Sequence, residues 1–108
     1  PDREYPIPRH KSGERFVRGP IPWEWLRLAL SIGGKSANLC LALWYLIGLK
    51  GTNPIRLTNK TVSEFGLTPK PVTRLLLAFE AKGLVDVDRQ RGRGPDVTIL
   101  DPSKRKVD

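Results

Sequence analysis

Three arginines alternate with glutamine and glycine in the short segment 89–94, a pattern suited to binding a polyanion. Glycine lets a backbone approach a groove closely, and arginine suits the negative potential of a narrow minor groove in DNA. The flanking segments 84–88 and 96–100 alternate apolar and polar residues, which is typical of half-buried strands. We therefore expect a β-hairpin whose tip contacts DNA through Arg89, Gln90, Arg91 and Arg93. A solvated turn whose charge only aids solubility is the alternative.

A second set of polar side chains falls on one face of a predicted helix, 69–82. Its apolar residues follow the 3-4 spacing of a buried helix face, at Val72, Leu75, Leu76 and Phe79. Thr68 is placed to cap this helix. Arg74, on the opposite face, can pair with O6 and N7 of guanine; the alternative is that it pairs with Glu64 or Glu80 and only solvates the surface. The residues expected to read DNA are Thr68, Lys70, Pro71, Thr73 and Arg74.

A shorter helix, 58–65, is predicted just before this one, and a short strand, 55–57, precedes it in turn. Gly66 permits the left-handed backbone conformation that a tight turn between two helices needs. Side chains at the start of the shorter helix can cap it and also bind the phosphates of a DNA backbone. The expected backbone anchors are Thr58, Asn59, Lys60 and Thr61.

The segment 72–85 resembles the DNA-reading helix and first wing strand of MarR-type and related bacterial winged-helix regulators, in which a basic hairpin follows. The matching residues are Val72, Thr73, Arg74, Glu80, Gly83, Leu84 and Val85, and Phe79 replaces the usual leucine. The resemblance covers roughly residues 53–100. It implies a three-helix core with a wing, and DNA binding by the second helix of the motif.

The rest of the chain supplies two further predicted helices and two extended ends. Segment 22–31 has an apolar face that begins with Trp23, Leu26 and Leu30 and is widened by Trp25, Leu28 and Ala29. The next helix, ending near Leu49, is apolar nearly all round, so we expect it at the centre. The predicted fold is mainly α with a small β-hairpin, a winged helix-turn-helix with an extra N-terminal helix. The expected divisions are an extended arm at 1–20, the domain at 21–102 and a basic tail at 103–108.

Three tryptophans fall within this region, and they could line a ligand pocket. In a small helical region they are more often core or interface residues, and we assign Trp44 to the core. Trp23 and Trp25 face differently on a helix because they are two residues apart. At least one of them is expected to contact a second subunit, and both are named as the predicted dimer contact.

The segment Gly33-Gly34-Lys35-Ser36 imitates the end of a phosphate-binding P-loop. The first glycine of that motif would fall at position 29, which is alanine, and the preceding segment is predicted to be helical. We interpret the segment as a turn between two helices, with Ser36 as a possible cap.

Charge and composition limit the function classes. The 108 residues carry a formal net charge of +8, which favours polyanions. No apolar run reaches the roughly 20 residues that span a bilayer, so no membrane partner is expected. Cys40, the only cysteine, excludes an internal disulfide and indicates a core residue in a reducing compartment. His10 is the only histidine and no carboxylate pair has a useful spacing, so we expect no enzyme, metal or cofactor.

Together these features predict a protein that binds double-stranded DNA in a sequence-specific manner. We expect it in the cytoplasm, associated with the nucleoid. The predicted role is a transcriptional regulator that occupies an operator as a homodimer, with any small-molecule effector left open. Two alternatives stay open. One is a replication, partition or recombination accessory factor of a mobile element, which would contact DNA in the same way as a repressor. The other is a winged-helix protein-interaction module with an apolar patch around Trp23 and Trp25.

Overall fold

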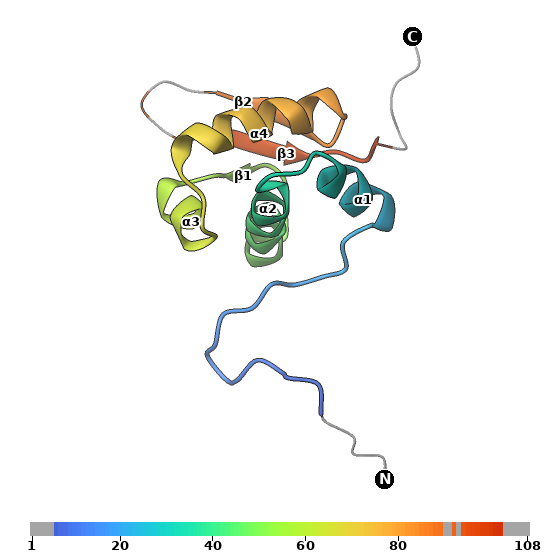
Figure 1. Ribbon diagram of the computed structural model, residues 1–108. Helices are drawn as coiled ribbons and strands as arrows, with labels where there is room; N and C mark the ends of the chain where they lie inside the picture. Colours follow the sequence, from blue (N-terminus) through green and yellow to red (C-terminus); the bar gives the residue numbers. More distant parts are fainter. Residues whose placement is uncertain (1–5, 90–91, 93, 103–108) are drawn as a thin grey trace.

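A computed structural model describes residues 6–89, 92 and 94–102 of the protein. Within these ranges the elements pack into one small domain, and an extended arm leads into it (Figure 1). The elements in chain order are α1 (Trp23–Ser31), α2 (Ser36–Lys50), β1 (Ile55–Arg56), α3 (Asn59–Glu64), α4 (Pro69–Ala81), β2 (Val85–Asp88) and β3 (Asp96–Ile99).

The strands form one antiparallel sheet in the order β1-β3-β2. In the central strand, Val97 lies opposite Ile55 of β1 on one side and opposite Val87 of β2 on the other. Val97 and Ile55 are buried, so this face of the sheet covers the core. The predicted hairpin is confirmed, and the predicted short strand joins it as a third strand.

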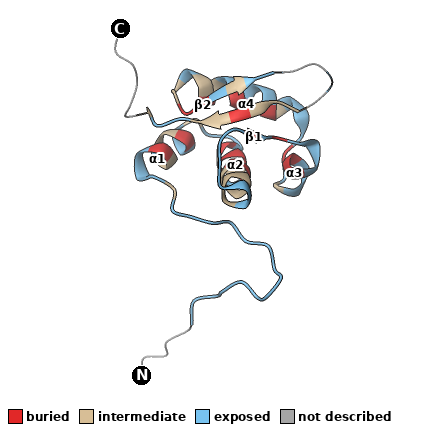
Figure 2. Cartoon of the chain, turned by 180° about the vertical axis from the view of Figure 1, so that it is seen from behind, coloured by how far each residue is buried: buried red, intermediate tan, exposed pale blue. Residues whose placement is uncertain are grey.

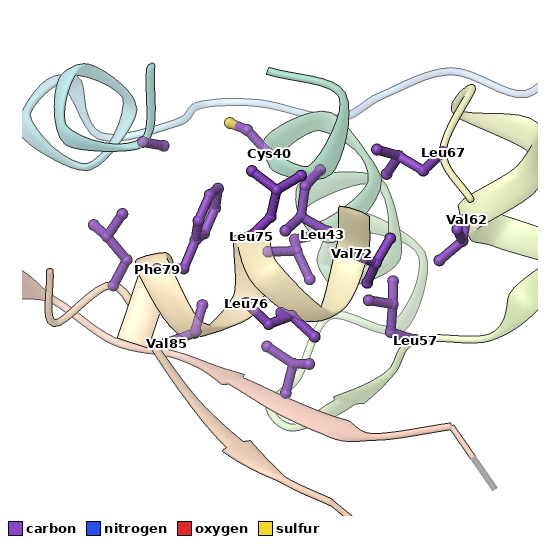
Figure 3. Close-up of a cluster of buried hydrophobic side chains, with 14 of the residues drawn as sticks. Cys40, Leu43, Leu57, Val62, Leu67, Val72, Leu75, Leu76, Phe79 and Val85 are labelled. Carbon is purple, nitrogen blue, oxygen red and sulfur yellow. The ribbon is translucent and has the colours of Figure 1, made fainter. Parts of the chain in front are cut away.

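Helix α2 is the central helix, as its apolar sequence predicted, and it packs against α1, α3, α4 and β1. Leu39, Cys40 and Leu43 are shielded from solvent, and Figure 3 shows Leu43 among the side chains of α4. Burial raises the pKa of the Cys40 thiol to about 11, so the thiol stays protonated at neutral pH. Cys40 is therefore a core residue, as expected.

Helix α4 buries the face that its 3-4 spacing predicted. Val72, Leu75, Leu76 and Phe79 all lie in the core. Each such side chain contributes roughly 1.5–3 kcal/mol by leaving water. Figure 2 shows the buried residues gathered where the helices meet the sheet, whereas the outer surfaces are exposed.

Helix α1 buries only part of the apolar face that the sequence predicted. Trp25 is 1% exposed and Ala29 is fully buried, whereas Trp23 is 77% exposed and Leu30 is 47% exposed. Trp25 donates a hydrogen bond from Nε1 to the carbonyl oxygen of Leu84 at 3.2 Å, which ties α1 to the start of β2. The prediction was wrong for Trp23 and Leu30 but not for Leu26 and Leu28, which pack partly buried against the core. Six of the nine residues of α1 are apolar, which is more than one buried face can hold.

Two of the expected helix caps differ in detail. Ser36 is the buried first residue of α2, and the cap position belongs to Lys35, which makes no capping bond through its side chain. Thr68 occupies the cap position of α4 but also makes no such bond. Gly66, between α3 and α4, has the left-handed conformation that was expected there, with φ of 76°.

Residues 6–20 form an extended arm, and every one of them is exposed (Figure 2). Nη2 of Arg15 forms an ion pair with Oε2 of Glu64 at 2.8 Å, which joins the arm to the end of α3. A Cβ atom placed on Gly48 would lie 2.8 Å from Cβ of Arg18, so the arm also rests against α2. The arm therefore contacts the domain along α2 and α3.

In the described part of the chain, no helix combines the length and apolar character needed to cross a membrane.

Candidate nucleic-acid interface

The three segments that were predicted to contact DNA meet around one hollow of about 240 Å³. Asn59 lines it from the start of α3, and Pro69 and Thr73 line it from the start of α4. Arg89 and Gly94 line it from the two ends of the hairpin loop. Figure 1 shows α3, the first turn of α4 and the loop end of β2 at the same side of the molecule.

Helix α4 presents a polar face because its apolar face is fully used by the core. Lys70, Thr73 and Arg74 are exposed, and Thr68 is exposed just before them. Pro71 is half-buried. Thr73 Oγ1 donates a hydrogen bond to the carbonyl oxygen of Pro69 at 3.3 Å, which leaves its lone pairs available as acceptors.

The carboxylates that were the alternative partners of Arg74 are engaged elsewhere. Glu64 pairs with Arg15 at 2.8 Å, and Glu80 pairs with Arg89 at 2.8 Å. Across the residues that the structure describes, the Arg74 side chain makes no ion pair or hydrogen bond. Its guanidinium is therefore exposed to solvent with all its N–H donors available.

Arg89, expected at the tip of the hairpin, is instead held against α4. Its Nη2 donates to Oε1 of Glu80 at 2.8 Å and its Nη1 to Oε2 at 3.4 Å. The hydrogen bond from Arg89 lowers the pKa of Glu80 below its ordinary value of 4.5. Arg89 therefore has a carboxylate partner already, and its charge is less available to DNA than the sequence suggested. Gln90, Arg91 and Arg93, which were predicted to contact DNA with it, lie outside the described residues.

The hairpin is placed against the start of α3 by a close backbone approach. The backbone N–H of Leu57 donates to the carbonyl oxygen of Pro95 at 3.0 Å. A Cβ atom on Gly94 would collide with the carbonyl oxygen of Leu57, so the site accepts only glycine without a backbone shift. In the sequence Gly94 belongs to the predicted hairpin tip, and nothing local marks this contact with Leu57.

One of the four expected phosphate anchors is wrong. Thr61 is only 8% exposed, and its Oγ1 accepts a hydrogen bond from Thr58 Oγ1 at 3.2 Å. Thr58 caps α3, because its Oγ1 also accepts the backbone N–H of Thr61 at 3.2 Å. Thr61 therefore points into the structure, whereas Thr58, Asn59 and Lys60 are exposed.

Two side chains that the sequence analysis did not select fix the turn between α3 and α4. Lys35 donates from Nζ to the carbonyl oxygen of Gly66 at 3.0 Å. Asn38 donates from Nδ2 to the carbonyl oxygen of Phe65 at 2.9 Å. Lys35 belongs to the P-loop-like segment and is the cap residue of α2, and Asn38 lies in the first turn of α2, so this end of α2 holds the turn. The signal is absent from the sequence because the contacts span about 30 residues.

The expected dimer contact is corrected for one residue. Trp25 lies in the core and is not available to a second subunit, whereas Trp23 is exposed. Trp44 is partly buried and packs edge-on against Trp25 with ring centroids 5.5 Å apart, in line with its assignment to the core.

Comparisons with known proteins identify no relative: no protein-family model, no curated protein and no solved structure matches the chain. In the described ranges, no group of histidine, cysteine and acidic side chains is arranged to hold a metal ion.

Proposed function

We propose that the chain binds double-stranded DNA in a sequence-specific manner as a winged helix-turn-helix protein, and that it regulates transcription by occupying an operator as a homodimer. In this proposal α4 enters the major groove, where Thr73 and Arg74 contact base edges. Asn59 and Lys60 bind phosphates beside the groove, and the hairpin loop follows the backbone or the adjacent minor groove. Such a protein would act at the nucleoid.

The exposed guanidinium of Arg74, which has no partner among the residues that the structure describes, carries this proposal. It lies on the same polar face as Lys70 and Thr73, and of these residues Thr73 lines the hollow shared by α3 and the hairpin. A bidentate pair between arginine and guanine contributes about 1–3 kcal/mol of discrimination between bases. The net charge of +8 adds a salt-sensitive attraction to phosphate that does not depend on sequence.

Selection of bound duplexes from a random library with the full chain tests the proposal. We expect enrichment of one motif, and for a homodimer two half-sites about one helical turn apart. A matched variant, Lys70→Ala with Arg74→Ala, should lose the motif. Recovery of unenriched sequences would contradict sequence-specific binding. Recovery of the same motif with the double variant would contradict recognition of the bases by α4.

The arrangement of recovered sites also separates two roles within DNA binding. A single palindrome over a promoter supports the regulator. Iterated direct repeats at an origin support a replication, partition or recombination factor instead.

A protein-interaction module is the second candidate, because α1 exposes two large apolar residues on one face. Trp23 and Leu30 are seven residues apart and are 77% and 47% exposed. This candidate predicts no retardation of any duplex at moderate salt, together with a partner whose binding is lost in Trp23→Ser.

A further inference from the structure

A second hollow, of about 400 Å³, lies between α1, α2 and the end of β3. Its apolar walls include Trp25 from α1, Trp44 and Ile47 from α2, and Ile99 and Leu100 from β3 and the residue that follows it. This volume falls in the range of about 300–1,000 Å³ that small-molecule sites occupy. The hollow shares no lining residue with the candidate DNA interface.

The two indoles in this wall differ in their hydrogen bonds. Trp25 Nε1 donates to the carbonyl oxygen of Leu84 at 3.2 Å. Within the described part of the chain, Trp44 Nε1 is buried and has no hydrogen-bond partner. Buried N–H donors are nearly always paired, so an orphan beside an apolar hollow indicates that an acceptor can be supplied there.

The polar groups of the wall restrict the charge of that acceptor. Glu24 and Asp101 are the charged side chains among the described lining residues; both are acidic, and Glu24 is paired with Arg27 of α1. The amide of Asn53 is engaged on both sides: its Nδ2 donates to the carbonyl oxygen of Ile99 at 3.1 Å, and its Oδ1 accepts the N–H of Ile99 at 3.0 Å. An anionic ligand would therefore find no cationic side chain among the described lining residues to pair with.

We propose that this hollow is a binding site for an uncharged, flat aromatic molecule that carries a carbonyl oxygen. The rings pack between the indole of Trp44 and the aliphatic wall of Ile47 and Ile99. A small rotation of the Trp44 ring brings Nε1 to the carbonyl oxygen as the ligand enters. The inference goes beyond the proposed function and does not rest on it.

Nuclear magnetic resonance of the ¹⁵N-labelled full chain tests the contact directly, with 2-acetylnaphthalene as the probe and no DNA present. The three indole N–H signals are assigned with single tryptophan-to-phenylalanine variants. We expect the Trp44 signal to move downfield on titration, because its N–H gains an acceptor. The Trp23 signal should stay in place, since that residue is outside the hollow. A Trp44 signal that does not move at saturating probe would overturn the proposal.

Three ligands of similar shape then test the chemical class by calorimetry. Trp44→Phe keeps an aromatic ring but removes the donor, so it should weaken 2-acetylnaphthalene roughly two- to tenfold and leave 2-isopropylnaphthalene unchanged. Trp23→Phe is the matched control and should change neither. The anion 2-naphthoate should bind at least about tenfold more weakly than the ketone. An equal loss of affinity for 2-acetylnaphthalene and 2-isopropylnaphthalene in Trp44→Phe would overturn the assignment. So would an affinity for 2-naphthoate equal to that for the ketone. If Trp44→Phe does not fold, the nuclear magnetic resonance titration of the unmodified chain with 2-acetylnaphthalene decides whether Trp44 contacts the ligand.

Discussion

Arg89 and Glu80 form a two-point ion pair that joins the end of β2 to the last turns of α4. The shorter contact, between Nη2 and Oε1, is 2.8 Å, and the side chains are 46% and 27% exposed. A planar guanidinium that meets both carboxylate oxygens fixes direction as well as distance. The pair therefore sets the position of the hairpin relative to the polar face of α4.

Glu80→Gln should release the hairpin from α4 with little loss of stability. An ion pair this exposed is screened by water, so we expect the free energy of unfolding to fall by less than about 1 kcal/mol. The amide exchange of Val87 and Asp88, at the end of β2, should become faster. Hydrogen exchange followed by mass spectrometry measures this, and Glu24→Gln, which alters an ion pair on α1, is the control. Unchanged exchange in β2 would show that the pair does not hold the hairpin.

Acid should destabilise the fold below the ordinary pKa of glutamate. Hydrogen bonds from arginine lower the pKa of three glutamates, Glu24, Glu64 and Glu80. A carboxylate whose pKa is lowered on folding contributes stability above its unfolded pKa of 4.5 and loses it as the pH falls towards the folded pKa. The melting temperature should therefore decrease from about pH 5 to about pH 3. Thermal unfolding followed by circular dichroism checks this, and the decrease should be smaller in Glu80→Gln.

Gly94→Ala should disturb the start of β3 more than an ordinary loop substitution. Its Cβ atom would collide with the carbonyl oxygen of Leu57, which belongs to the backbone and cannot rotate away. We expect a loss of about 1–3 kcal/mol in the free energy of unfolding. Gly19→Ala is the control, because its Cβ would lie 3.9 Å from the nearest atom. Urea denaturation of both variants decides the point, and equal stabilities would show that the backbone yields easily.

The central position of α2 was predictable because it is apolar nearly all round, and the buried face of α4 was predictable because local spacing determines it. Leu75 and Phe79 recur at helical spacing with polar residues opposite, so only one face of α4 can be buried. The same argument failed for α1, where Trp23 and Trp25 are equally apolar. There the choice depends on the distant carbonyl of Leu84, which Trp25 reaches.

The candidate interface was predictable in outline but not in its ion pairs. The exposure of Arg74 follows from the period of α4, whereas the partner of Arg89 depends on how the sheet packs on α4. Thr61 has the residue type of a phosphate ligand, but its side chain is buried and its Oγ1 accepts a hydrogen bond from Thr58 Oγ1. The contact of Arg89 with Glu80 arises from the packing of the sheet on α4, which residue type and spacing do not encode.

Arg74→Ala should weaken binding to the cognate duplex more than binding to random duplexes. The reason is that a contact to guanine discriminates between bases, and its loss costs about 1–3 kcal/mol at the cognate site, or roughly 5- to 150-fold in affinity. Fluorescence anisotropy with both duplexes at one salt concentration measures the two affinities. Lys50→Ala, at the far end of α2, removes one positive charge away from the interface and should affect both duplexes slightly. An equal loss on both duplexes in Arg74→Ala would show that Arg74 contacts only phosphate.

Arg89→Ala should leave the salt dependence of DNA binding almost unchanged, because Glu80 already neutralises this guanidinium. Each phosphate contact contributes about 0.9 to the slope of log affinity against log salt concentration. Removing Arg91 and Arg93 together should therefore lower the slope by about 1.8 if each contacts one phosphate, as the sequence pattern predicts. Anisotropy titrations over a range of potassium chloride concentrations give both slopes. A drop of about 0.9 in Arg89→Ala would show that DNA displaces Glu80 from Arg89. In that case Glu80→Gln, which frees the guanidinium in advance, should raise the affinity for every duplex alike.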